Sequence, residues 1–260
     1  MAVDRVAALR RQSEEIVRYC RDLTDDQWQT PSLAGGWRVQ DVVAHLASAV
    51  HAVFTPGVVS LLTSSEIERT NDHFVDKRRD WEPSRVLAEF ETWSGRLGKV
   101  TVVLARTPVA KLPMPLAELG RFPAAVLLGG AFVFDQHTHL HHDIAPVLEL
   151  PAPPCDAQRV EVILEWMFAV LNNQIRSAGP DWLGKTISID LRGPGGGTWR
   201  IGPDGTVTAT ATAGSVTRIS GVAEEFPAWS TGRVPWRDRD VKITGDAELG
   251  AEFLDWMNIV

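Results

Sequence analysis

Cysteine is scarce in this sequence. Only Cys20 and Cys155 occur among its 260 residues, and they lie too far apart for a Cys-x-x-Cys metal motif or a disulfide framework. Two isolated thiols are typical of a protein from a reducing compartment, where cysteines stay unpaired and have structural roles. We therefore expect a cytoplasmic protein without disulfide bonds.

Positive charge is also in deficit. The sequence has 26 basic and 33 acidic side chains, which give a formal net charge of -7. The basic cluster Lys77–Arg79 is short and is flanked by Asp76 and Asp80. A protein that binds nucleic acid needs a basic face that neutralises phosphates, so the composition argues against nucleic acid as a partner.

Long hydrophobic runs are missing. No stretch approaches the roughly 20 apolar residues that cross a bilayer as a helix. The first residues, MAVDRVAALRRQSEE, also lack the apolar segment of a secretory signal peptide. We expect neither a membrane span nor export.

The residues that are present suit a globular core, since 44% are hydrophobic and 23% are charged. In the first half, apolar side chains recur at helical spacing. This pattern predicts four helices, over residues 3–23, from Val39 to Val50, from Pro83 to about Leu97, and over 124–142. Four helices of this length favour an antiparallel four-helix bundle.

The second half has a different texture. Four prolines between Pro146 and Pro154 indicate a linker, and a further apolar-faced helix follows it. Short alternating segments then predict strands at TISIDL, TWRIG, TVTATAT, TRISG and RDVKITGD, before a closing helix from Ala247 to Met257. We expect a helical domain over 1–148 and an α+β domain with an antiparallel sheet over 155–260.

Four of the seven histidines lie in DQHTHLHHDI, residues 135–144. Residues four apart share one face of a helix, so Asp135, His139 and Asp143 form one stripe. Leu128 and Phe132 extend this stripe, which predicts that it faces the core. The opposite stripe is then expected to be exposed or at the rim, and it carries His137, His141 and His142.

An inward carboxylate needs a partner, because burying an unpaired charge is costly. A divalent metal ion binds both carboxylate and imidazole, and His45, within the apolar stretch VVAHL, is the candidate third ligand. Asp41, one turn earlier, is placed to orient His45 as an acceptor. Spacing alone leaves two alternatives open: a hydrogen-bonded core histidine at 45, and a plain ion pair between Asp135 and His139.

The stretch DDQWQTPSLAGGWRVQDVVAHLA, residues 25–47, resembles the opening motif of the mycothiol-dependent maleylpyruvate isomerase family, which has a DinB-like metal-binding domain. The matching residues are Trp28, Pro31, Trp37, Asp41, Val42, His45 and Leu46. TNDHFVDKR and DQHTHLHHDI resemble later motifs of the same domain. Residues 197–205, 215–233 and 241–257 are similar to the family's C-terminal domain, which is like sterol carrier protein.

The resemblance implies a metal triad of His45, Asp135 and His139, with Asp where the family has Glu. It implies zinc, with nickel as the second choice, and mycothiol as the thiol that the metal activates. The implied activity is cis-trans isomerisation of maleylpyruvate, in which a thiolate adds to a conjugated double bond and leaves again, or thiol S-transfer. Arg233 is the candidate for binding a substrate carboxylate, ahead of Arg237 and Arg239.

Two other functions stay open from the sequence. One is a non-catalytic protein that binds an apolar molecule in the second domain. The other is a metal-dependent hydrolase built on the same helices. Metal content separates the first from the enzymes, and a thiol requirement separates the isomerase or transferase from the hydrolase.

Overall fold

The computed structural model describes residues 3–64, 66–210 and 215–259. The chain forms two compact units, Met1–Pro154 and Cys155–Val260. Within the described residues, no single helix is long and apolar enough to cross a membrane, and α3 and α4 meet that test only as a pair bent by 100°.

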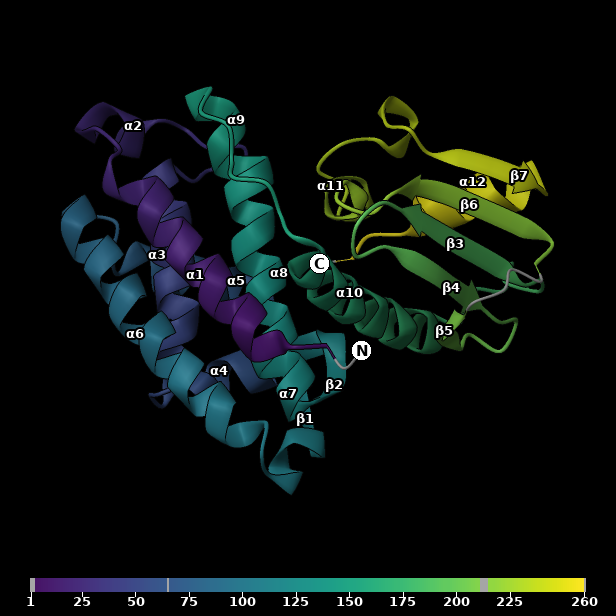
Figure 1. Ribbon diagram of the computed structural model, residues 1–260, viewed down its shortest axis with the longest axis horizontal. Helices are drawn as coiled ribbons and strands as arrows, with labels where there is room; N and C mark the ends of the chain where they lie inside the picture. Colours follow the sequence, from purple (N-terminus) through teal and green to yellow (C-terminus); the bar gives the residue numbers. More distant parts are fainter. Residues whose placement is uncertain (1–2, 65, 211–214, 260) are drawn as a thin grey trace. The chain divides into compact units, whose positions relative to one another are not determined.

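The first unit is helical (Figure 1). Its helices are α1 (Arg5–Arg21), α2 (Asp25–Gln29), α3 (Val39–Ala52), α4 (Gly57–Thr63), α5 (Ile67–Asp76), α6 (Pro83–Leu104), α7 (Ala124–Val126), α8 (Phe132–Thr138) and α9 (Ala145–Leu148). A short hairpin, β1 (Pro113–Leu116) and β2 (Gly120–Pro123), precedes α7. The four predicted helices are confirmed, whereas α4, α5 and the hairpin were not predicted.

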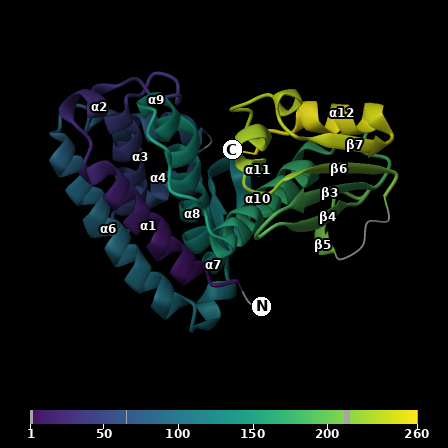
Figure 2. The same cartoon turned by 45° about the horizontal axis from the view of Figure 1, so that its top comes forward.

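Local sequence explains where these helices begin. Asp4 caps α1 by accepting a hydrogen bond from the Ala7 amide at 3.0 Å, and Thr24 forms a capping box with Gln27 at the start of α2. Pro83 occupies the first turn of α6, where its missing N–H costs nothing. Figure 2 shows α1 and α6 side by side along their lengths.

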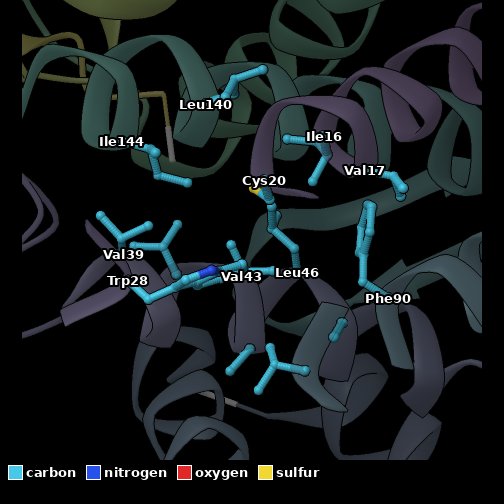
Figure 3. Packing of buried hydrophobic residues seen from close by; sticks show 14 residues of the cluster. Ile16, Val17, Cys20, Trp28, Val39, Val43, Leu46, Phe90, Leu140 and Ile144 are labelled. Carbon is cyan, nitrogen blue, oxygen red and sulfur yellow. The ribbon is translucent and has the colours of Figure 1, made fainter. Parts of the chain in front are cut away.

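The core of the first unit lies between α1, α3, α6 and the helix that runs from α7 to α9 (Figure 3). Leu46 and Val43 of α3 meet Phe90 of α6 and Ile16 of α1 in this core. Cys20 is part of it and is fully buried, and this burial raises the pKa of its thiol to about 12. The structural role expected for Cys20 therefore agrees with its position.

The segment from α7 to α9 is one helical path with two π-helical stretches, Leu127–Ala131 and His139–Ile144. A π-helical turn contains more residues than an α-helical one and occurs often at functional sites. The first stretch lies against α1, where a Cβ added to Gly129 would lie only 2.7 Å from the Cβ of Arg5. Glycine thus allows the two helices to approach each other closely.

The second unit contains a five-stranded sheet with two longer helices and one short helix. Its elements are α10 (Ala157–Ala178), β3 (Ile187–Arg192), β4 (Gly197–Ile201), β5 (Val207–Thr210), β6 (Thr217–Val222), α11 (Phe226–Ser230), β7 (Lys242–Gly245) and α12 (Ala247–Trp256). The strand order is β5-β4-β3-β6-β7, and α12 contacts β6 and β7. The predicted strand at 206–212 extends beyond the described residues after Thr210.

The sheet is mixed, so the prediction of a purely antiparallel sheet is wrong for one pair. β3 and β6 run parallel, with Ile189 opposite Ile219, while the other neighbours are antiparallel. The reason is topological: β4 and β5 extend the sheet on one side of β3, and the chain then returns to its other side. Alternate residues of β3 and β6 point into the core, as the sequence pattern predicts.

Candidate metal centre

Helix α3 positions the first predicted ligand. Its apolar residues are buried against α1 and α6, and His45 is 5% exposed on a neighbouring face of the same helix. Asp135 lies on α8 and His139 directly follows that helix, at the first position of the second π-helical stretch. The structure therefore brings His45 together with two residues of another helical segment, the nearer of which is 90 positions away in the sequence.

The three side chains converge through one carboxylate oxygen. Oδ1 of Asp135 lies 3.3 Å from Nε2 of His45 and 3.5 Å from Nε2 of His139. All three candidate ligand atoms lie within 4.8 Å of one another. A tetrahedral zinc ion with bonds of about 2.0–2.1 Å holds its ligand atoms about 3.3 Å apart, so the two separations from Oδ1 are close to those that such an ion requires.

The charges of the triad shift the pKa values of Asp135 and His139 in opposite directions. Burial opposes ionisation of Asp135, but the facing His45 and His139 rings lower its pKa well below the ordinary value. For His139, burial favours the neutral ring, yet Asp135 and Asp143 together raise its pKa to about 9. A carboxylate between two imidazoles is thus held ionised, which is the state that a metal ion requires.

Asp143 lies beside His139, on the far side of its ring from Asp135. Its Oδ2 is 2.7 Å from Nδ1 of His139, and its side chain is buried. This hydrogen bond places the proton of a neutral His139 on Nδ1 and leaves Nε2 free to accept a metal. Asp143 could therefore orient His139 from behind the candidate ligands.

Asp41 does not take the supporting role predicted for it. Its fully buried carboxylate binds Arg38, with both Nε and an amino nitrogen at 2.9 Å, and Arg79 at 3.5 Å. It also accepts a hydrogen bond from the Arg38 amide and so caps α3. Among the described residues, no group binds Nδ1 of His45. Asp41 fixes the start of the helix rather than the ring.

Trp37 also lies beside the triad, although the sequence predicted no role for it beyond its match to the family motif. Its ring centroid lies 5.2 Å from that of His45 and 6.3 Å from that of His139. Its Nε1 donates to Oδ1 of Asp72, on α5, at 3.0 Å. The glycines before Trp37 indicated a loop, but neither spacing nor composition indicated that this loop folds back over α3.

The second histidine stripe was predicted to be exposed or at the rim, and this prediction is wrong for His137. His137 is 1% exposed, and His141 and His142 are half-buried. The reason lies in α1, which contacts α8 and carries the buried Glu15, 3.7 Å from Nε2 of His141. Because α1 covers this side of α8, polar residues such as His137 are buried there as well.

The predicted arginines lie in the second unit. Arg237 forms a bidentate ion pair with Asp255 at 2.6 and 2.8 Å, and Arg239 lies 4.0 Å from Glu225. Arg233 follows Gly232, whose φ of +70° turns the chain after α11, and it donates to Oγ1 of Thr231 at 3.1 Å. Arg233 is exposed.

Three comparisons bear on this arrangement. Residues 9–128 match the family model of the mycothiol maleylpyruvate isomerase N-terminal domain. An uncharacterized protein of Mycobacterium tuberculosis (strain ATCC 25618 / H37Rv) is 24% identical over 253 residues, covering 93% of this chain and 90% of the relative. Among solved structures, the crystal structure of the mycothiol-dependent maleylpyruvate isomerase is similar to this chain. The similarity covers 92% of this chain and 91% of the isomerase chain, with a TM-score of 0.57 and 18% identity. Sterol carrier protein 2-like 2 from Aedes aegypti is similar over 38% of this chain and 95% of that one, with a TM-score of 0.32 and 18% identity.

The fold and the site define a class of protein, in which a helical domain with a His-Asp-His cluster is followed by a mixed-sheet α+β domain. Both histidines of the cluster are buried, and Asp135 is half-buried. Over 92% of its length, the chain has a fold similar to that of the mycothiol-dependent maleylpyruvate isomerase. More narrowly, residues 9–128 are similar to the N-terminal domain of mycothiol maleylpyruvate isomerases, whose family model they match. The resemblance predicted from the residues around Trp37 and His45 is thereby confirmed for this part of the chain.

Proposed function

We propose that this protein is a metal-dependent enzyme that uses a small thiol, mycothiol, as cofactor or co-substrate. Its reaction is cis-trans isomerisation of a maleylpyruvate-like substrate or thiol S-transfer. The observation that carries the proposal is the convergence of His45, Asp135 and His139 at ligand spacing. The match of the N-terminal domain and the shared fold support mycothiol as the thiol, and isomerisation or S-transfer as the reaction.

The triad would hold one divalent ion, zinc or nickel, because two imidazoles and a carboxylate suit either. Three protein ligands leave positions open, as in catalytic rather than structural sites. An ion there favours the thiolate of a bound thiol over the thiol and so generates a nucleophile at neutral pH. Asp143 keeps Nε2 of His139 available, and the buried surroundings of His45 strengthen the electrostatic interactions inside the site.

The thiol must come from outside the chain in this proposal. Cys20 is fully buried among apolar side chains, and its raised pKa of about 12 disfavours a thiolate. Cys155 begins the second unit and is not among the residues of the triad. Arg233 is our candidate for binding a substrate carboxylate, because a guanidinium pairs with a carboxylate in a bidentate manner.

The test combines metal analysis with a thiol-dependent assay. We expect one divalent ion per chain, an empty site in His45→Ala and in His139→Ala, and loss of turnover in Asp135→Ala. Replacement of both Cys20 and Cys155 by Ser should leave mycothiol-dependent turnover of maleylpyruvate nearly intact. His51→Ala is the matched control, because His51 also lies on α3 but binds Glu89 at 2.6 Å, outside the triad.

Two outcomes would overturn the proposal. Full metal occupancy in both His45→Ala and His139→Ala would show that the ion binds elsewhere. Turnover of an ester or amide with no thiol present would instead favour metal-activated water and a hydrolase.

A further inference from the structure

Trp37 occupies a defined place beside the triad. Its indole lies against both imidazoles, tilted by 37° to His45 and by 34° to His139, while the two imidazoles meet edge to face at 5.1 Å. Because the indole contacts both rings, a group bound beside their Nε2 atoms lies within reach of the indole. The ring therefore forms an aromatic wall of the site.

The loop that carries Trp37 is fixed at several points. The Trp37 amide donates to Ala34 O at 3.1 Å, and Trp37 O accepts from the Ser32 amide at 2.9 Å. The Leu33 amide donates to the carbonyl of Asp143, the residue whose carboxylate holds His139. The backbone thus ties the wall to the same helical segment that supplies two of the candidate ligands.

Asp72 fixes the remaining freedom of the indole. Its carboxylate accepts the Nε1–H of Trp37 at 3.0 Å from a different helix, α5. An indole carries only a donor, so this bond satisfies its single polar group and selects one orientation of the ring plane. Asp72 is therefore a positioning residue that acts through Trp37.

We propose that Trp37, oriented by Asp72, determines the specificity of the metal site and favours ligands with a flat, unsaturated group next to the coordinating atom. This inference rests on the proposed function, because it concerns what binds beside the triad. The physical basis is the stacking of π-systems, which adds to simple burial. A saturated group of equal size fills the same space but loses this contribution.

The experiment uses the full chain loaded with Co²⁺, whose absorption spectrum reports both metal binding and thiolate coordination. The probes are phenylmethanethiol and cyclohexylmethanethiol, which have similar size and differ in aromaticity. We expect a preference for the aromatic thiol in the wild type that falls by roughly threefold to tenfold in Trp37→Leu. Trp37→Phe should retain most of it, and bound Co²⁺ should quench less tryptophan fluorescence in both variants.

The control variant is Trp93→Leu. Trp93 also stacks on a histidine, His51 at 4.1 Å, but this histidine is not part of the triad. The preference should persist in this variant. Asp72→Leu should lower the preference, and Asp72→Asn should preserve it, because an amide oxygen still accepts the indole N–H.

The outcomes separate the two proposals. If Co²⁺ does not bind to the wild type, the triad is wrong and the inference fails with it. If Co²⁺ binds and the preference is the same in Trp37→Leu, the triad stands and Trp37 does not determine specificity. If Asp72→Leu keeps the wild-type preference, the positioning role of Asp72 is wrong.

Discussion

Asp143 contributes no ligand atom to the triad, yet its hydrogen bond decides which nitrogen of His139 is available. Partners of this kind tune metal affinity by about tenfold to a hundredfold. We therefore expect Asp143→Ala to weaken zinc binding by about that factor, and Asp143→Asn to weaken it less, because its amide oxygen still accepts from Nδ1. Competition with a chromophoric chelator measures the affinity.

The control for this prediction is Asp76→Ala. Asp76 is an exposed acid that pairs with Arg79 at 2.9 Å and should leave zinc affinity unchanged. An unaltered affinity in Asp143→Ala would mean that Nε2 of His139 is presented without help from Asp143.

The raised pKa of His139, about 9, makes metal binding depend on pH. A proton on His139 must leave before Nε2 can bind a metal, so protons compete with the ion below this pKa. We expect the apparent zinc affinity to rise by up to about tenfold per pH unit toward pH 9 and to level off above it. Calorimetric titrations between pH 7 and 9.5 test this, and a flat profile over that range would contradict it.

At the scale of elements, the start of α3 depends on Asp41. Burial raises the pKa of Asp41, but hydrogen bonds and charge from Arg38, with the charge of Arg79, hold it below the ordinary value. Loss of a helix cap costs about 0.5–2 kcal/mol, so Asp41→Ala should lower the free energy of unfolding by about that amount. Urea unfolding gives the stability, and metal analysis should still find one ion per chain.

The Asp41→Ala variant also distinguishes capping of α3 from support of His45. If Asp41→Ala instead retains its stability and loses zinc, the carboxylate supports His45 as the sequence predicted, and the capping network is secondary. Arg38→Ala is the companion variant, because it removes the same ion pair and leaves the carboxylate in place.

The helices that carry the triad follow from the sequence, because apolar side chains recur at helical spacing around His45 and around Asp135. The buried face of the second helix does not follow, because Leu128, Phe132 and Asp135 of the predicted inward stripe are only half-buried. The surroundings of the second stripe do not follow. His137 is buried because α1 covers α8, and the polar face of α1 gives no periodic apolar pattern that predicts this contact. A period of 3.6 residues per turn also does not predict the π-helical stretch at His139–Ile144.

The pairing of distant strands is also not predictable from the sequence. The alternation in TISIDL and TRISG predicts strands, yet nothing in either segment states that they pair in parallel. The position of Trp37 over His45 is a similar case, because a loop's path depends on tertiary contacts such as the bond to Asp72.

At the scale of the whole molecule, the two units hold different parts of the proposed function. The triad and Asp143 all lie within Met1–Pro154. Arg233 lies in Cys155–Val260, and its role as a carboxylate ligand is a separate proposal. The two parts can therefore be separated by measurement, since loss of Arg233 should affect the substrate and not the metal.

Arg233→Ala should keep one metal ion per chain and raise the KM for a carboxylate substrate. A hydrogen bond to a charged group contributes about 1.5–3 kcal/mol, which corresponds to roughly tenfold to a hundredfold in KM. Arg233→Lys should recover only part of this, because an ammonium group lacks the bidentate geometry of a guanidinium. Arg237→Ala is the matched control, since Arg237 already forms a bidentate pair with Asp255. The decisive comparison uses the methyl ester of the same substrate, whose KM should be nearly the same in wild type and Arg233→Ala. An equal rise of KM for acid and ester would show that Arg233 shapes the second unit and does not bind the carboxylate.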